Sequence, residues 1–194
     1  MARPREFDEA AVLDLAMRQF WSHGYEATSI RELADGTGIT AASLYNAFGD
    51  KRSLYRRALD AYIAGSFVDR VARLEGRLPP LEALTAFFDE VVESSLADAE
   101  QRGCMLVNTA MELAPKDPDF RDVVQNVLVE IELFFRRSVL AGQKDGSITK
   151  SQPAADLART LLGLHLGLRV LARTRLEKAL LKGAVRPVLA MLAA

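Results

Sequence analysis

Residues 28–54 read TSIRELADGTGITAASLYNAFGDKRSL, and this stretch predicts two short helices joined by a tight turn. Ser29 and Glu32 have the spacing of a capping box, which starts the first helix. Gly38 supplies the positive φ that the turn between the helices needs. Thr40 has a side chain that caps the second helix. Together these residues predict a helix-turn-helix.

The second helix of this motif is predicted to present short, neutral side chains on its outer face. Leu33 and Leu44 fall where the two helices bury side chains, and Ala34 is small enough for a close crossing. The outward positions are Thr40, Ala41, Ala42, Ser43, Tyr45 and Asn46. Hydroxyl and amide groups of this size let a helix approach base edges and phosphates in a major groove. The alternative is an ordinary helical hairpin, which does not require this combination of small residue, turn glycine and caps.

The motif closely resembles the DNA-binding domain of the TetR family of bacterial transcriptional regulators. The resemblance is carried by the runs TSIRELA at 28–34, GITAASLYNAF at 38–48 and DKRSL at 50–54, within roughly residues 7–60. A looser similarity to one group of these regulators includes RGCMLVNTA at 102–110. The resemblance implies an all-helical homodimer that binds a palindromic operator in double-stranded DNA. It also implies repression in most cases, and release by a small-molecule inducer.

The resemblance also assigns DNA contacts residue by residue. Tyr45 and Lys51 match positions that grip phosphates, whereas Arg31 and Asn46 match positions that read bases. The predicted DNA-binding residues are Thr28, Ser29, Arg31, Thr40, Ala41, Ala42, Ser43, Tyr45, Asn46 and Lys51.

Two positions of the second helix depart from the family's pattern. Ala42 stands where glycine or proline is common, and Ala41 stands where a polar base reader often lies. Either methyl group is able to contact a thymine methyl. The operator sequence therefore does not follow from these residues.

The charge balance predicts a local basic surface rather than a generally basic protein. The chain has 25 Lys plus Arg and 26 Asp plus Glu, and residues 1–60 hold 8 basic and 9 acidic residues. A polycation that coats nucleic acid is thereby excluded. Arg3 and Arg5 form either an arm that reaches DNA or a solvated tail, and Lys51 and Arg52 lie beside the second helix. We expect modest non-specific affinity and a moderate salt dependence.

Composition and helix breakers predict an all-α fold of about nine helices. Hydrophobic residues make up 49% of the chain, and no alternating strand pattern is present. The expected helices cover about 9–22, 30–35, 41–47, 51–74, 81–96, 104–114, 118–141, 153–175 and 176–192, with a polar loop at 143–152. Residues 1–50 are predicted to form a three-helix, helix-turn-helix domain. Residues 51–194 would form a larger ligand-binding and dimerisation domain that begins with a connecting helix at 51–74.

A dimer interface is predicted in the C-terminal part of the chain. Residues 161–172, LLGLHLGLRVLA, are apolar nearly all round, so this helix needs cover on both sides. A second subunit supplies that cover, although burial within one subunit is the alternative. The last helix would complete a four-helix interface. The predicted interface residues are Gly163, Gly167, Val170, Leu181, Val185 and Val188.

A ligand pocket is expected among the helices of residues 81–175. The predicted lining residues are Phe88, Cys104, Asn108, Met111, Phe135 and His165. Cys104, Asn108 and Met111 share one face by helical spacing, and an amide on an apolar face needs a hydrogen-bond partner. Each of these residues has an alternative role in ordinary packing.

Other classes of function fit the sequence less well. There is no glycine-rich phosphate loop, no paired-histidine metal spacing and a single cysteine, so no enzyme, metal site or cofactor is expected. Neither a signal peptide nor a membrane-spanning run is recognised, which predicts a cytoplasmic, nucleoid-associated protein with no membrane partner. The remaining alternatives are a regulator switched by Cys104 modification or by a protein partner, and an activator.

Overall fold

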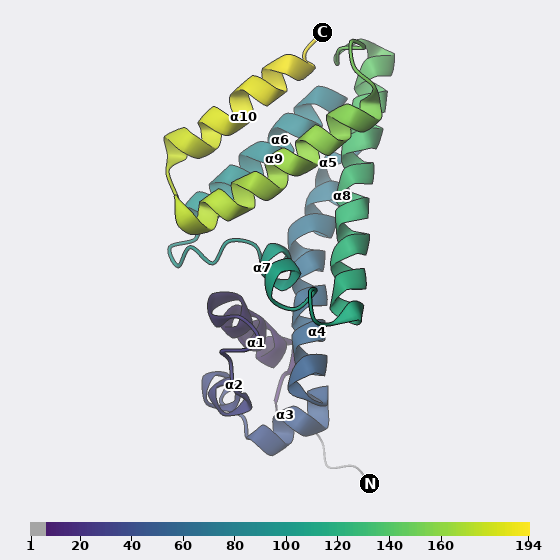
Figure 1. Ribbon diagram of the computed structural model, residues 1–194. Helices are drawn as coiled ribbons and strands as arrows, with labels where there is room; N and C mark the ends of the chain where they lie inside the picture. The colour runs from purple at the N-terminus through teal and green to yellow at the C-terminus, as the bar shows by residue number, and fades with distance from the viewer. Residues whose placement is uncertain (1–6) are drawn as a thin grey trace. The chain divides into compact units, whose positions relative to one another are not determined.

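The computed structural model describes residues 7–194, which fold into helices without an extended sheet (Figure 1). The helices are α1 (Glu9–His23), α2 (Ile30–Thr37), α3 (Ala41–Phe48), α4 (Lys51–Ile63), α5 (Asp69–Leu74), α6 (Pro80–Ala97), α7 (Met105–Glu112), α8 (Pro118–Asp145), α9 (Ala154–Thr174) and α10 (Lys178–Leu192). A π-helical turn, η1 (Ala64–Val68), joins α4 to α5 without a break. The described residues therefore form nine continuous helices, which confirms the predicted all-α fold.

The first compact unit of the chain ends at Gly65 and contains α1 to α4. Its apolar centre includes the fully buried side chains of Phe20, Leu33, Leu44 and Tyr55. The rings of Phe20 and Tyr55 meet edge to face, with 4.9 Å between their centroids. These residues come from all four helices, so the helix-turn-helix is held by a core of its own.

Helix α4 packs on α1 within this first unit. Its buried face consists of Leu54, Tyr55, Ala58, Leu59 and Tyr62. The compact unit thus extends beyond residue 50, the boundary predicted from the sequence. The assignment of separate roles to residues 1–50 and 51–194 stays a prediction.

The π-helical turn changes which residues face inward after Tyr62. An unbroken α-helix over 51–74 predicts Val68 as an inward residue, but its side chain is 53% exposed. A π turn adds one residue to the helical repeat and rotates everything that follows. Arg70 and Leu74 are the residues that become buried. Regular α-helical spacing across residues 51–74 would therefore place Val68 on the wrong face.

The second compact unit begins at Ser66 and has a core of aromatic side chains. Phe87 and Phe88 of α6 lie against Phe134 and Phe135 of α8, and all four rings are fully buried. Centroid separations from Phe87 to the other three rings are between 5.1 and 5.5 Å. Helix α9 packs on α8 and α6, and α10 packs on α6 and α9.

Helix α8 is longer than the sequence predicts. It continues to Asp145 and ends at Gly146, which has the left-handed conformation of a C-cap. Gly142 does not stop the helix; a Cβ there would lie 2.5 Å from the Ile148 side chain, so this glycine leaves room for Ile148. The polar loop predicted to start at residue 143 therefore starts at Gly146.

Candidate nucleic-acid interface

The turn between α2 and α3 has the predicted backbone geometry. Gly38 has a φ of 73°, and its N–H donates to the carbonyl of Ala34 over 3.0 Å. The Ser29 hydroxyl accepts the N–H of Glu32, while the Glu32 carboxylate accepts the N–H of Ser29 over 2.7 Å. Thr40 caps α3 by accepting the N–H of Ser43 over 3.1 Å. The helix-turn-helix predicted from the sequence is thus present.

Helix α3 exposes most of the side chains that were predicted to face outward. Tyr45 is 51% exposed, and Thr40, Ala42 and Asn46 are also exposed. Ala41 and Ser43 are half-buried. Arg31 is exposed on α2 and lines a surface cleft of about 730 Å³ together with Thr40 and Ala41. The structure therefore brings the Arg31 guanidinium and the Thr40 hydroxyl to one cleft, and it leaves the Asn46 amide exposed on α3.

One predicted contact residue does not lie on this surface. Thr28 is only 1% exposed, and its hydroxyl donates to the carbonyl of Gly24 over 2.6 Å. A side chain that closes this loop internally is not available to a phosphate, so the prediction for Thr28 is wrong. Ser29, which follows it, is exposed at the N-terminus of α2. Arg3 and Arg5, the predicted N-terminal arm, lie outside the described residues.

Lys51 is held at the start of α4 by an aromatic ring. Its Nζ lies 4.3 Å from the centroid of Tyr25 and donates to the carbonyl of Glu26 over 3.5 Å. A cation in this position is oriented by the ring before any DNA arrives. Lys51 thus offers a positive charge beside α3.

Two acidic residues of this region, Glu32 and Asp50, serve as helix caps. The pKa of Glu32 is lowered, first by the hydrogen bond from the backbone of Ser29. The pKa of Asp50 is lowered, first by the hydrogen bond from the backbone of Ser53. Both carboxylates therefore stabilise the first turn of a helix in their ionised form.

Two family models match the chain. The first, of bacterial regulatory proteins of the tetR family, covers residues 12–58, and the second, of the tetracyclin repressor-like C-terminal domain, covers residues 80–188. The chain belongs to the TetR family. Members of this family are transcriptional regulators that bind DNA, and the chain is a regulator of this kind rather than an enzyme.

Curated relatives and solved structures agree with this assignment. An uncharacterized HTH-type transcriptional regulator of Bacillus subtilis, YezE, is 33% identical over 89% of this chain and 90% of its own length. The HTH-type transcriptional repressor ComR of Escherichia coli is 32% identical over 88% and 82%. A cysteine mutant of the TetR-family regulator CifR, in complex with 26-bp operator DNA, is 30% identical with a TM-score of 0.87, covering 98% of this chain and 100% of that one.

The second unit of this TetR-family protein buries most of the predicted ligand-binding residues. Phe88 and Phe135 are stacked in the aromatic core, Cys104 is 6% exposed, and His165 lies 5.4 Å from the ring of Phe87. Asn108 donates from Nδ2 to the carbonyl of Arg102 over 3.1 Å, so the side-chain amide has the hydrogen-bond partner that was expected for it.

Met111 does not share a buried face with Cys104 and Asn108. Its side chain is 77% exposed, because α7 turns Met105, Leu106 and Thr109 inward instead. Cys104 precedes the helix as its N-cap and has an extended backbone conformation. The predicted common face of these three residues is therefore wrong.

The predicted dimer residues divide into two sets. Gly163, Gly167 and Val170 are exposed along one face of α9, and nothing lies within 4 Å of a Cβ built on either glycine. Leu181 and Val185 are only 1% and 5% exposed, because this face of α10 packs within its own subunit. Their prediction as partner contacts is wrong. Val188 is half-buried.

The described residues contain neither a membrane-spanning helix nor a cluster of metal-ligating side chains. No helix in residues 7–194 is long and apolar enough to cross a bilayer. Over the same residues, no group of three or more histidine, cysteine or acidic side chains is arranged to hold a metal ion.

Acidification is expected to destabilise the second unit through His165. Burial, followed by the nearby charges of Arg169 and Arg70, holds the pKa of His165 well below its ordinary value of 6.5. Below about pH 6.5 the unfolded chain binds a proton that the folded chain refuses, so stability is lost as the pH falls. We expect His165→Gln to reduce the loss of unfolding free energy between about pH 7.5 and 5.5 by about 1 kcal/mol.

Urea unfolding at each pH measures this effect. The exposed His23 provides the matched control, and His23→Gln should leave the pH dependence of the second unit as in the wild type. Equal pH dependence in His165→Gln and the wild type would contradict the prediction.

Proposed function

We propose that the protein is a dimeric repressor that binds a palindromic operator and leaves it when a small molecule binds the second unit. The observation that carries this proposal is the exposed outer face of α3, set between the Gly38 turn and the oriented Lys51. The operator complex of the related CifR supports it, because that chain matches this one over its full length.

We infer that α3 enters the major groove of the operator, and that phosphate contacts on either side of it determine how deeply the helix lies in the groove. Asn46 and Arg31 are able to read base edges, because both side chains are exposed and carry hydrogen-bond donors. Tyr45 and Lys51 are placed to contact phosphates, which position the helix without reading sequence. Ser29 adds the N-terminus of α2 to these phosphate contacts.

We infer that the outer face of α9 forms the dimer interface. Gly163 and Gly167 allow a partner helix to approach closely, and Val170, which is 50% exposed, adds apolar surface. On α10, Val188 is half-buried and Met191 is 61% exposed, so both are available to a partner. Such a two-fold interface sets the distance between the two α3 helices, and hence the half-site spacing.

The continuous helix from α4 to α5 provides a route for the ligand's effect. It passes from the first unit to the second without a loop, through the π-helical turn η1. We infer that a ligand bound in the second unit shifts the populations of DNA-binding and non-binding states through this connection. The burial of Cys104 favours this scheme over a switch by thiol modification. The protein would act in the cytoplasm, at the nucleoid.

The proposal is tested by selecting operators from random double-stranded DNA with the full-length protein. We expect an enriched palindrome whose half-sites lie about one helical turn apart, around 10 bp. Affinity for it should fall steadily as salt is raised. Recovery of sequences without two-fold symmetry, or binding that does not respond to salt, would refute the proposal.

A further inference from the structure

The interior of the second unit contains an arginine without a carboxylate partner. Arg169 of α9 is 7% exposed, and among the described residues its guanidinium makes one hydrogen bond, from Nη1 to the Ser95 hydroxyl over 3.5 Å. Its Nε has no hydrogen-bond partner. An arginine stays charged in proteins, and a buried charge normally has an opposite charge beside it. Arg169 therefore has the properties expected of an anion-binding residue.

A second buried polar group without a partner lies one helical turn before Arg169. His165 is 6% exposed, and its Nδ1 has no hydrogen-bond partner. Its ring is surrounded by the rings of Phe87 at 5.4 Å and Phe135 at 6.5 Å. The lowered pKa of His165, caused first by burial and then by Arg169 and Arg70, keeps the imidazole neutral. It is then able to donate one hydrogen bond.

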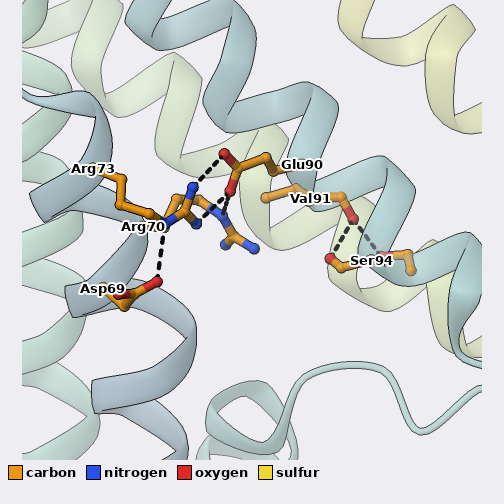
Figure 2. Close-up of polar contacts among 7 residues, drawn as sticks. Asp69, Arg70, Arg73, Glu90, Val91 and Ser94 are labelled. Atoms are coloured by element: carbon orange, nitrogen blue, oxygen red, sulfur yellow. Dashed lines mark hydrogen bonds and ion pairs between the residues drawn. The ribbon is translucent and has the colours of Figure 1, made fainter. Parts of the chain in front are cut away.

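The carboxylate on α6 in this region, Glu90, is already shared by two arginines of α5. Arg70 donates from Nε to Glu90 over 3.1 Å, and Arg73 donates two hydrogen bonds to the same carboxylate, each 2.9 Å long. Figure 2 shows the Glu90 carboxylate facing both guanidinium groups. Glu90 forms no ion pair with Arg169. This cluster does not supply the missing negative charge.

We propose that Arg169 binds the carboxylate of the effector, assisted by His165, and that the effector is an organic acid with an apolar body. The inference rests on the proposed function, in which the second unit binds a small molecule. A guanidinium binds a carboxylate through two parallel hydrogen bonds, which suits an arginine whose Nε is unoccupied. The aromatic rings around His165 favour an apolar remainder.

The stability of the ligand-free protein provides the first test. Arg169→Met removes a buried charge while keeping an apolar side chain of similar length, so we expect the Tm to rise by about 2–4 °C. Arg173→Met, an exposed position one turn further along α9, should change the Tm little. A lower Tm in Arg169→Met would show that the subunit itself satisfies this arginine, and would overturn the proposal.

Direct binding provides the second test. The full-length protein is titrated calorimetrically with benzoate, phenylacetate and octanoate, and with the corresponding primary amides. We expect at least one acid to bind, its amide to bind at least about 10-fold more weakly, and Arg169→Met to lose the acid while Arg173→Met retains it. The proposal fails if no acid binds, or if Arg169→Met binds the acids as the wild type does.

Operator release separates this inference from the function on which it rests. If an acid binds through Arg169 but leaves the operator complex intact, the site is correct and ligand-driven release is wrong. If a neutral amide releases the operator equally from the wild type and Arg169→Met, release is correct and the carboxylate site is wrong.

Discussion

Tyr45→Ala is expected to lower the affinity for the selected operator by about 10- to 100-fold, which corresponds to about 1.4–2.8 kcal/mol. The side chain is half exposed on the outer face of α3, so its removal leaves the core of the first unit intact. Alanine takes away both the hydroxyl that would contact a phosphate and the ring that would exclude water beside it. Fluorescence anisotropy with labelled operator DNA measures the change.

Two further variants show which part of Tyr45 matters and whether the loss is specific. Tyr45→Phe keeps the ring and removes only the hydroxyl. We expect it to lower the operator affinity by roughly 3- to 10-fold, the effect of losing one hydrogen bond. Leu15→Ala changes an exposed apolar side chain on α1 rather than on α3, and should bind as the wild type does. Wild-type operator affinity in Tyr45→Ala would mean that the surface assigned to DNA is wrong.

The first unit follows from the sequence because its signals are local. Ser29, Glu32 and Thr40 make their capping bonds within three residues, and Gly38 makes the turn with its own backbone. Such features depend only on residues that are close in sequence, so they can be predicted without knowing the tertiary structure. Thr28 differs, since its burial depends on how the loop before α2 closes onto Gly24.

The second unit is harder to predict from the sequence because its burial pattern depends on packing between distant helices. The spacing of apolar residues in the sequence does not predict the π-helical turn, which leaves the Val68 side chain exposed. In α10 more than one apolar stripe is present, and only the positions of α6 and α9 decide that Leu181 and Val185 face inward. The missing partner of Arg169 is also invisible in sequence, because an arginine in a helix gives no sign of what lies across from it.

Phe87→Ala is expected to destabilise the second unit by about 3–5 kcal/mol. The ring is fully buried, and it contacts the rings of Phe88, Phe134, Phe135 and His165. Truncation to alanine leaves a cavity that these surrounding rings cannot fill completely. Val129→Ala, an exposed position on α8, is the matched control and should cost less than about 0.5 kcal/mol. Urea unfolding, followed by circular dichroism, measures both variants.

The position of the single tryptophan allows this loss to be assigned to one unit. Trp21 lies in α1, where its ring contacts Tyr62 of α4, so its fluorescence reports on the first unit. Circular dichroism reports chiefly on the second unit, which contains α5 to α10 and therefore most of the helical residues. In Phe87→Ala we expect the dichroism midpoint to fall by about 1 M urea or more, and by more than the fluorescence midpoint. Coincident transitions would mean that the two units unfold together, whereas a shift no larger than that of Val129→Ala would contradict the assigned core.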